Sequence, residues 1–341
     1  MRVTKGSLAG TRASLCHSIR SQSALKFPQV PDAELPTLVP KARQLLFGVV
    51  RRAQGWSFQP ASRYHRSGMP KTVLMCPPTF FDVREPKNPH MGLAIDRVLA
   101  QHQWENLCGA MRESGLKVEF IDPVQDLDDM VFAANQVFVG EHPSVGKFIV
   151  PSRMRYPSRQ REVAFYVEWF RRRGYRVIEL DLNREYLEGH GDLLWHPDHS
   201  RVWAGYGFRS TRGGVERFAT AMDKLSFPVV PLGLVDKHCY HLDTCFCPLN
   251  EAAVMIYPGA FTAASLDAIC DGFSRVHHLS RDEALQFMGN GVAVNGRFIT
   301  PRLTPNVSYI LAKEGLTPVV VDTSEFEKSG GSVFCMKTFI D

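Results

Sequence analysis

Short apolar stretches alternate with stretches of helical spacing from Lys71 to the end of the chain. Residues 71–83 and 116–123 predict strands, because β-branched and aromatic residues run between proline and glycine positions there. Helices are expected where apolar residues recur every three or four positions, at residues 102–115, 161–174 and 213–226, and the first two of these runs stop at a glycine. Further strands are expected at residues 129–140, 147–152, 175–182, 191–197, 201–208 and 228–235. This pattern predicts a mixed α/β protein.

The predicted elements recur in one order, which is strand, strand, helix and strand, over about 50 residues. The same order returns in residues 244–261 and in residues 291–326, so that about five rounds fit after Lys71. Five similar units predict a closed, propeller-like arrangement with a site on its central axis. An open doubly wound sheet is the alternative. No G-x-G-x-x-G or P-loop motif follows a predicted strand, which argues against a nucleotide-binding version of that alternative.

Basic residues are concentrated near the N-terminus. Residues 1–70 contain 11 Lys and Arg against 2 Asp and Glu, a local charge of +9, and the remainder carries −4. The net charge of +5 is therefore a property of this segment and not of a nucleic-acid-binding face, and we expect no nucleic-acid partner. We expect residues 1–70 to be a basic, disordered leader and residues 71–341 to form one catalytic domain.

The start of the leader is similar in composition to an organellar transit peptide. Residues 1–31 contain no acid, five serines and five basic residues. A disordered leader, or codons upstream of a start at Met69, explains this composition equally well. No apolar run approaches the ~18–20 residues that span a bilayer, so no membrane segment is expected. The eight cysteines are scattered, which favours a reducing compartment. We expect a cytoplasmic location, or a mitochondrial one if residues 1–31 act as a transit peptide.

Residues 240–250, YHLDTCFCPLN, concentrate reactive side chains. Four side chains in or beside this segment could bind zinc: Cys239, His241, Cys245 and Cys247. Zinc sites usually pair cysteines as C-x-x-C with a second pair further on, so we favour core thiols over a metal site. If the segment is a strand, Cys245 and Cys247 share one buried face. His241 and Asp243 then project together, as a proton-transfer pair would, although a structural pair explains the spacing as well.

Two other stretches carry candidate chemistry. Glu188 and Asp192 lie on a Gly-rich bend, where paired acids can hold a cation, unless the bend is a solvated turn. Cys335 follows Gly330 and Gly331, whose backbone is free to adopt unusual angles. A thiol in this place can act as a nucleophile if a histidine and a nearby positive charge lower its pKa. Without those neighbours, a core thiol explains the position equally well.

Several motifs occur together and in order: LMCPPTFFDV with NPHM, DMVFAANQ, LEGHGDLLW, WAGYGFRS, YHLDTCFCPL and SGGSVFCM. The set resembles the guanidino-group-modifying enzymes, which are arginine deiminases, dimethylarginine hydrolases and amidinotransferases, and is most similar to the arginine dihydrolase domains. The resemblance extends from about Val73 to the C-terminus. It implies the family fold, a five-bladed α/β propeller (pentein) of ββαβ repeats around a central active site, in agreement with the repeat count. It implies no metal and no cofactor.

The resemblance also implies roles for individual residues. Cys335 would attack the guanidinium carbon, His241 would protonate the departing nitrogen and then activate water, and Glu188 would hold the guanidinium. Six residues would bind or support the substrate: Asn135 at the guanidinium, Asp243 and Asp192 as supporting acids, and Asn88, Arg159 and Arg209 at the amino-acid end. Arginine suits a carboxylate because its planar fork pairs bidentately.

Asn135 bears on the choice of substrate. Deiminases and dimethylarginine hydrolases usually carry a carboxylate at this position, and dihydrolase-like members carry Asn. A neutral amide tolerates the ureido group of citrulline as well as a guanidinium. We therefore expect hydrolysis of arginine to ornithine, ammonia and carbon dioxide through a covalent thiouronium intermediate. The alternatives are a dimethylarginine hydrolase or arginine deiminase that gives citrulline, then an amidinotransferase, or a propeller that only binds. The expected partner is arginine or a methylated arginine; a homo-oligomer is compatible with the sequence.

Overall fold

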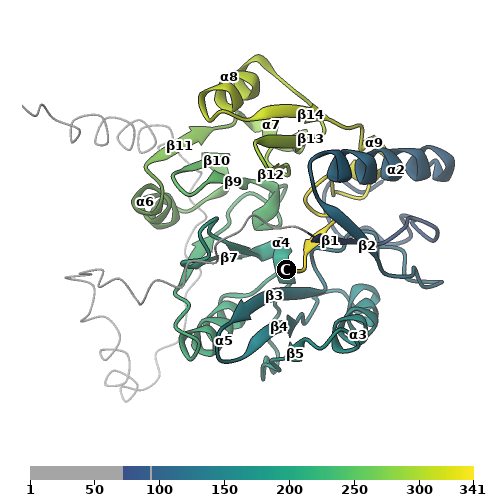
Figure 1. The fold of residues 1–341 in the computed structure, drawn as a ribbon, viewed down its shortest axis with the longest axis vertical. Helices are drawn as coiled ribbons and strands as arrows, with labels where there is room; N and C mark the ends of the chain where they lie inside the picture. Colours follow the sequence, from purple (N-terminus) through teal and green to yellow (C-terminus); the bar gives the residue numbers. More distant parts are fainter. Residues whose placement is uncertain (1–71, 93) are drawn as a thin grey trace, which may run out of the picture.

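The computed structural model describes residues 72–92 and 94–341. Within these residues, five three-stranded sheets are arranged around a common centre (Figure 1). The predicted five-bladed α/β propeller is thus confirmed. The predicted leader, residues 1–70, lies outside the described residues, so its disorder stays a prediction.

Each sheet forms one blade, in which the middle strand is hydrogen-bonded to the strand on either side. The blades are β15–β1–β2 (Thr338–Phe339, Thr72–Met75, Lys117–Phe120), β3–β4–β5 (Val137–His142, Gly146–Pro151, Arg176–Val177), β6–β7–β8 (Leu193–Trp195, Val202–Tyr206, Val229–Gly233), β9–β10–β11 (Phe246–Asn250, Ala253–Ile256, Arg275–His278) and β12–β13–β14 (Val292–Val294, Arg297–Thr300, Thr317–Val320).

The first two strands of each blade are antiparallel and the last two are parallel. Parallel neighbours require a crossover, and a helix supplies it in every blade. These crossover helices are α2 (Arg97–Glu113), α3 (Pro157–Arg171), α5 (Arg212–Asp223), α6 (Ala263–Gly272) and α8 (Pro305–Lys313). The shorter helices are α4 (Gly189–Asp192), α7 (Arg281–Leu285) and α9 (Ser324–Glu327), with single turns η2 (Leu242–Thr244) and η3 (Pro258–Ala260).

The two ends of the described chain close the ring. β15 pairs antiparallel with β1, with Val73 opposite Phe339 and Leu74 opposite Thr338. The C-terminal strand therefore completes the blade that β1 begins. This closure fixes the position of Cys335, which lies three residues before β15.

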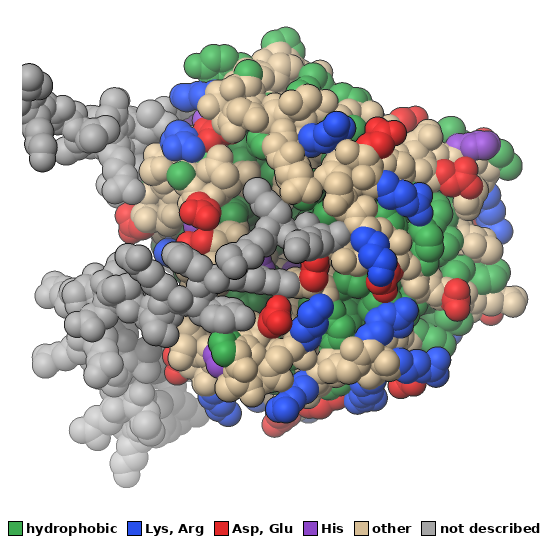
Figure 2. Space-filling view, in the orientation of Figure 1, with side chains coloured by type: hydrophobic (Ala, Val, Ile, Leu, Met, Phe, Trp, Pro, Cys, Tyr) green, Lys and Arg blue, Asp and Glu red, His purple; other side chains and the backbone are tan. Residues whose placement is uncertain are grey.

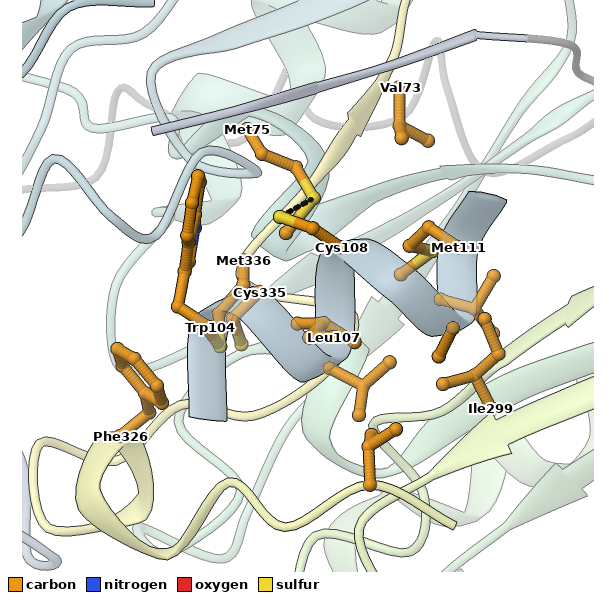
Figure 3. Close-up of a cluster of buried hydrophobic side chains, with 14 of the residues drawn as sticks. Val73, Met75, Trp104, Leu107, Cys108, Met111, Ile299, Phe326, Cys335 and Met336 are labelled. Atoms are coloured by element: carbon orange, nitrogen blue, oxygen red, sulfur yellow. Dashed lines mark hydrogen bonds between the residues drawn. The ribbon is translucent and has the colours of Figure 1, made fainter. Parts of the chain in front are cut away.

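Buried apolar side chains fill the space between each sheet and its helix. In the blade of β1, the side chains of Trp104, Leu107 and Met111 on α2 pack against Met75 and neighbouring core residues (Figure 3). Asp96 caps the N-terminus of this helix, and its side chain accepts hydrogen bonds from the backbone N–H groups of Val98 and Leu99. Cys335 and Met336 belong to the same cluster, so the core anchors the loop that carries the candidate nucleophile.

Two predicted strands differ from the observed ones. Residues 129–136 form turns, and β3 begins only at Val137. Tertiary hydrogen bonds explain this difference: Tyr166 donates to the carbonyl of Met130, and Arg159 donates to that of Phe132, so these carbonyls are not available to a strand partner. The strand expected at residues 175–182 is reduced to β5, Arg176–Val177.

On the face shown in Figure 2, basic and acidic side chains of the described residues are interspersed. In the described part of the chain, every helix is too short or too polar to cross a bilayer.

Candidate active site

The first strand of each blade is its inner strand: β15, β3, β6, β9 and β12. A loop that reaches the central axis precedes each inner strand. Asn135 and Asn290 each lie two residues before the inner strands β3 and β12. Glu188 and His241 each lie five residues before β6 and β9, and Cys335 lies three residues before β15. The five-fold repeat therefore brings together side chains that are distant in sequence.

These loops enclose a pocket with an empty volume of about 290 Å³. Its lining is mostly polar or charged, and comprises Lys87, Asn88, Met91, Asp129, Phe132, Asn135, Arg159, Arg209, Tyr240, His241, Ser329, Gly331 and Cys335. Of the nine predicted site residues, six therefore line one pocket. Of the remaining three, Glu188 and Asp243 contact lining residues, whereas Asp192 contacts Ser210 and Leu242, the sequence neighbours of the lining residues Arg209 and His241.

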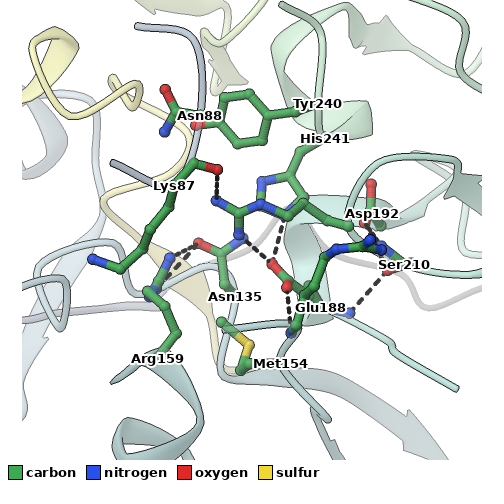
Figure 4. Close-up of polar contacts among 12 residues, drawn as sticks. Lys87, Asn88, Asn135, Met154, Arg159, Glu188, Asp192, Ser210, Tyr240 and His241 are labelled. Carbon is green, nitrogen blue, oxygen red and sulfur yellow. Dashed lines mark hydrogen bonds and ion pairs between the residues drawn. The ribbon is translucent and has the colours of Figure 1, made fainter. Parts of the chain in front are cut away.

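Glu188 is the centre of the polar contacts and is fully buried (Figure 4). One carboxylate oxygen lies 2.8 Å from His241 Nε2 and 2.8 Å from Arg209 Nη1, and the other accepts the backbone N–H of Arg155 at 2.8 Å. Burial by itself would raise the pKa of Glu188, but Arg209 and the hydrogen bond to His241 outweigh burial and hold that pKa well below its usual value. Glu188 is therefore ionised, and His241 Nε2 donates its proton to it.

Asp192 lies behind the pocket and orients the catalytic loop. Its Oδ2 accepts hydrogen bonds from the Ser210 hydroxyl at 2.6 Å and backbone N–H at 3.1 Å, and its Oδ1 accepts from the Leu242 N–H at 3.0 Å. Burial raises its pKa to about 6. Both oxygens are thus engaged within the chain, and the structure places Asp192 as support for the residue next to His241, away from the pocket surface.

The Cys335 thiol contacts two polar side chains. Its Sγ lies 3.1 Å from Asp243 Oδ2 and 3.2 Å from Asn290 Nδ2. The sequence left open whether a histidine and a positive charge lower the pKa of this thiol. In the structure, burial and the Asp243 carboxylate raise the pKa of Cys335 well above its usual value. The thiol is therefore protonated and donates to Asp243, whose own pKa burial raises to about 7.

Asn135 faces the pocket beside Arg159. The Asn135 Oδ1 lies 3.4 Å from Arg159 Nη1, and among the described residues its Nδ2 has no hydrogen-bond partner. Arg159 is buried and also contacts Glu162, with Nε 3.1 Å from both carboxylate oxygens. The side chain of Asn135 packs over Gly191, where a Cβ atom would collide with Asn135 Nδ2. Glycine at position 191 therefore leaves room for the amide in this position.

The other two residues predicted at the amino-acid end also line the pocket. The Arg209 guanidinium lies between the rings of Tyr156 and Tyr240, 4.8 Å and 5.0 Å from their centroids. The Asn88 amide donates to the Ser329 carbonyl and accepts from the His90 N–H, both at 2.9 Å. The Asn88 amide thus hydrogen-bonds to the backbone of the chain, and the Arg209 guanidinium pairs with the Glu188 carboxylate.

The predicted pairing of His241 with Asp243 on one strand face is wrong. His241 directly precedes the single turn η2, Asp243 lies within that turn, and β9 begins only at Phe246. A 3₁₀ turn has about three residues per turn, so side chains two positions apart point in different directions. His241 accordingly contacts Glu188, and Asp243 contacts Cys335.

Cys245 and Cys247 are free, buried thiols. They belong to two different hydrophobic clusters, one with Phe246 and Trp203 and one with Met255. In the described part of the chain, no three His, Cys, Asp or Glu side chains converge as a metal site would require.

Two features of the site were not identified from the sequence. Asn290 contacts the Cys335 thiol, and its position immediately before an inner strand repeats that of Asn135, so the repeat could have indicated it. Lys87 and Asp129 form a buried ion pair in the pocket wall, with Nζ 2.9 Å from Oδ2. No periodic pattern connects these two loop residues.

This chain is similar in sequence to a known protein family and to individual proteins of known activity. A family model described as N,N dimethylarginine dimethylhydrolase, eukaryotic, matches residues 90–340. The N(G),N(G)-dimethylarginine dimethylaminohydrolase of Mycobacterium tuberculosis is 35% identical over 278 residues, which cover 81% of this chain and 87% of that protein. The bifunctional arginine dihydrolase/ornithine cyclodeaminase ArgZ of Synechocystis is 34% identical over 269 residues, 77% of this chain but 37% of ArgZ.

A solved structure extends the comparison to three dimensions. The N-terminal domain of ArgZ, crystallised with a covalently bound reaction intermediate, has a TM-score of 0.74 and 33% sequence identity. The match covers 79% of this chain and 97% of that domain.

Proposed function

The chain belongs to the N,N dimethylarginine dimethylhydrolase family of guanidino-group hydrolases, and we propose that it hydrolyses arginine to ornithine, carbon dioxide and two molecules of ammonia. Hydrolysis of a guanidino C–N bond is the activity that the family shares. The choice of arginine as substrate, and of ornithine as product, rests on Asn135.

The observation that carries the proposal is the amide donor of Asn135, which has no hydrogen-bond partner within residues 72–92 and 94–341. Its oxygen faces the Arg159 guanidinium, so its NH₂ group is the part left for a ligand. A buried donor without a partner costs about 1–3 kcal/mol, and the ureido oxygen of citrulline would satisfy this donor. Citrulline would then be retained for a second hydrolysis. A carboxylate at position 135 would repel the same oxygen and release citrulline.

The first half-reaction uses the contacts around Cys335. The cationic guanidinium binds near Glu188, and its charge favours loss of the thiol proton to Asp243. The sulfur then bonds to the guanidinium carbon. His241 donates a proton to the departing nitrogen, the C–N bond breaks, and ammonia leaves a cationic thiouronium on Cys335. Splitting the reaction in this way lowers the barrier that the resonance-stabilised guanidinium presents to water.

The second half-reaction returns the thiol. His241, now neutral, takes a proton from a water molecule whose oxygen bonds to the thiouronium carbon. The C–S bond breaks, Cys335 regains a proton, and citrulline forms. Repetition of both halves on the ureido carbon releases the second ammonia and leaves a carbamate of ornithine, which loses carbon dioxide. Glu188 holds the positive charge of His241 and of the substrate throughout.

Methylated arginine is the second candidate substrate. The matching family model and the M. tuberculosis relative both carry dimethylarginine in their names. With that substrate the first half-reaction would release dimethylamine, and the second would form citrulline.

Product analysis distinguishes the two candidates. The full chain is incubated separately with arginine, dimethylarginine and citrulline, and amino acids and amines are quantified. We expect ornithine and two ammonia from each arginine, and consumption of citrulline. Citrulline as the sole product from arginine would contradict the dihydrolase proposal. Dimethylamine release from methylated arginine, without turnover of arginine, would support the second candidate.

A further inference from the structure

A buried lysine in the pocket wall has no role in the reaction described above. Lys87 Nζ lies 2.9 Å from Asp129 Oδ2, and both side chains are almost fully buried. Asp129 Oδ1 is engaged as well, because the Ser329 hydroxyl donates to it at 3.3 Å. Asp129 is the one carboxylate among the residues that line the pocket of the described chain. Its negative charge is thus already neutralised by the protein.

Backbone acceptors in the same wall are also occupied by cations of the chain. The Lys87 carbonyl accepts from Arg209 Nη2 at 3.5 Å. The Asp129 and Phe132 carbonyls both accept from Arg159 Nη2 at 3.4 Å. An ammonium group on a ligand needs acceptors and a nearby negative charge. At this end of the pocket the protein's own lysine and arginines occupy the acceptors that such a group would use.

The charge balance changes when a guanidinium binds to Glu188. Arg209 Nη1 contacts Glu188 at 2.8 Å in the structure, so a ligand guanidinium competes with Arg209 for that carboxylate. Arg209 is then a buried cation without an acid, and a ligand carboxylate restores the balance. Lys87 stays with Asp129 and Arg159 with Glu162. One guanidinium and one carboxylate leave the net charge of the pocket as it is without a ligand, and an additional ammonium group adds an uncompensated positive charge.

We propose that Lys87 is a specificity-determining residue that leaves the α-ammonium group of arginine without a favourable contact, so that recognition rests on the guanidinium and the carboxylate, and ω-guanidino carboxylic acids that lack the α-ammonium group are substrates at least as good as arginine. This inference rests on the proposed guanidino hydrolysis and extends its substrate class to those acids. An α-ammonium group at the same wall would lie near the Lys87 ammonium and share one carboxylate with it. Repulsion of this kind is a common means of rejecting a competing ligand.

Three compounds of related length test the substrate class with the full chain. They are arginine, 5-guanidinopentanoate, which lacks only the α-ammonium group, and agmatine, which lacks only the carboxylate. Ammonia release is measured for each. We expect 5-guanidinopentanoate to have a kcat/KM at least equal to that of arginine, and agmatine to be at least 100-fold poorer than 5-guanidinopentanoate. A higher kcat/KM for arginine than for 5-guanidinopentanoate would overturn the inference.

Two variants of Lys87 test the residue itself. Lys87→Met retains the length of the side chain and frees Asp129, and should shift the ratio of kcat/KM values at least tenfold toward arginine. Lys87→Arg keeps the cation beside Asp129 and should preserve the wild-type ratio. An unchanged ratio in a folded Lys87→Met variant would assign the selectivity elsewhere. If Lys87→Met does not fold, the wild-type comparison of the three compounds decides the question without it.

The same measurements separate this inference from the function on which it rests. Turnover of arginine without turnover of 5-guanidinopentanoate would reject the inference and leave the proposed function in place. Absence of ammonia from all three compounds would reject both. Turnover of 5-guanidinopentanoate together with citrulline as the sole product from arginine would support the inference and reject repeated hydrolysis.

Discussion

Replacement of Asn135 by aspartate should change the main product from ornithine to citrulline. The new carboxylate would stand about where the amide Oδ1 now lies, 3.4 Å from Arg159 Nη1. At an effective dielectric constant near 20, two unit charges at this distance attract by about 5 kcal/mol before desolvation is subtracted. The introduced carboxylate would therefore stay ionised. It would attract the guanidinium of arginine and repel the ureido oxygen of citrulline.

The size of the product change follows from the amide donor. Wild-type Asn135 Nδ2 is buried without a partner among the described residues, and a ureido oxygen that pairs with it recovers about 1–3 kcal/mol. This free energy corresponds to a retention of citrulline about 5- to 150-fold longer than in a site without the donor. We expect the ratio of ornithine to citrulline to fall by a factor in that range in the Asn135→Asp variant.

The assay is amino-acid analysis at equal conversion of arginine. Asn135→Ala is the matched control, because it removes the donor without adding a charge. It should also release citrulline but bind arginine less tightly than Asn135→Asp. A ratio of ornithine to citrulline that stays within twofold of wild type in Asn135→Asp would refute the reasoning.

Three other perturbations follow from the structure. Glu188→Gln keeps the volume of the side chain but removes the charge beside His241 and Arg209, and should lower kcat/KM for arginine by ~100- to 1,000-fold in steady-state assays; a loss below tenfold would exclude the proposed charge stabilisation. Burial lowers the pKa of Lys337 from 10.5 to about 7, so the folded state binds fewer protons than the unfolded state between these values and stability rises with pH there. In Lys337→Met, the free energy of unfolding should rise less between pH 7.5 and pH 9.5 than in the wild type, by up to ~1.4 kcal/mol per pH unit, as measured by urea unfolding at the two pH values. An equal rise in the variant and the wild type would contradict a buried, deprotonated lysine. A chain that begins at Met69 retains β1 and should be soluble with wild-type activity, and failure of either would show that residues 1–68 are structural.

The repeated strands and helices could be predicted because each blade carries its own local signals. The crossover helices α2 and α3 end near Gly115 and Gly174, which both adopt the left-handed backbone conformation that favours glycine. The strand predicted across residues 129–136 failed because side chains from α3 bind its carbonyl groups. Such contacts come from a distant part of the chain and leave no local pattern.

In the site, likewise, individual residues could be predicted from the sequence but the contacts between them could not. Cys335, His241 and Glu188 could be identified because they stand in long motifs, and the structure brings them to one axis. Their pairings could not be identified, because they depend on how five loops converge. His241 pairs with Glu188 and not with Asp243, which is two residues away in sequence. The Lys87–Asp129 ion pair likewise joins two loops whose association is visible only in the folded protein.

The most direct test of the account is detection of the covalent intermediate on Cys335. The full chain is mixed with arginine, quenched in acid within milliseconds, and examined by intact-protein mass spectrometry and peptide mapping. We predict a mass increase equal to arginine minus one ammonia, located on Cys335, and neither adduct nor turnover in the Cys335→Ser variant. An adduct on another residue, or turnover by the serine variant within a few-fold of wild type, would contradict covalent catalysis by Cys335.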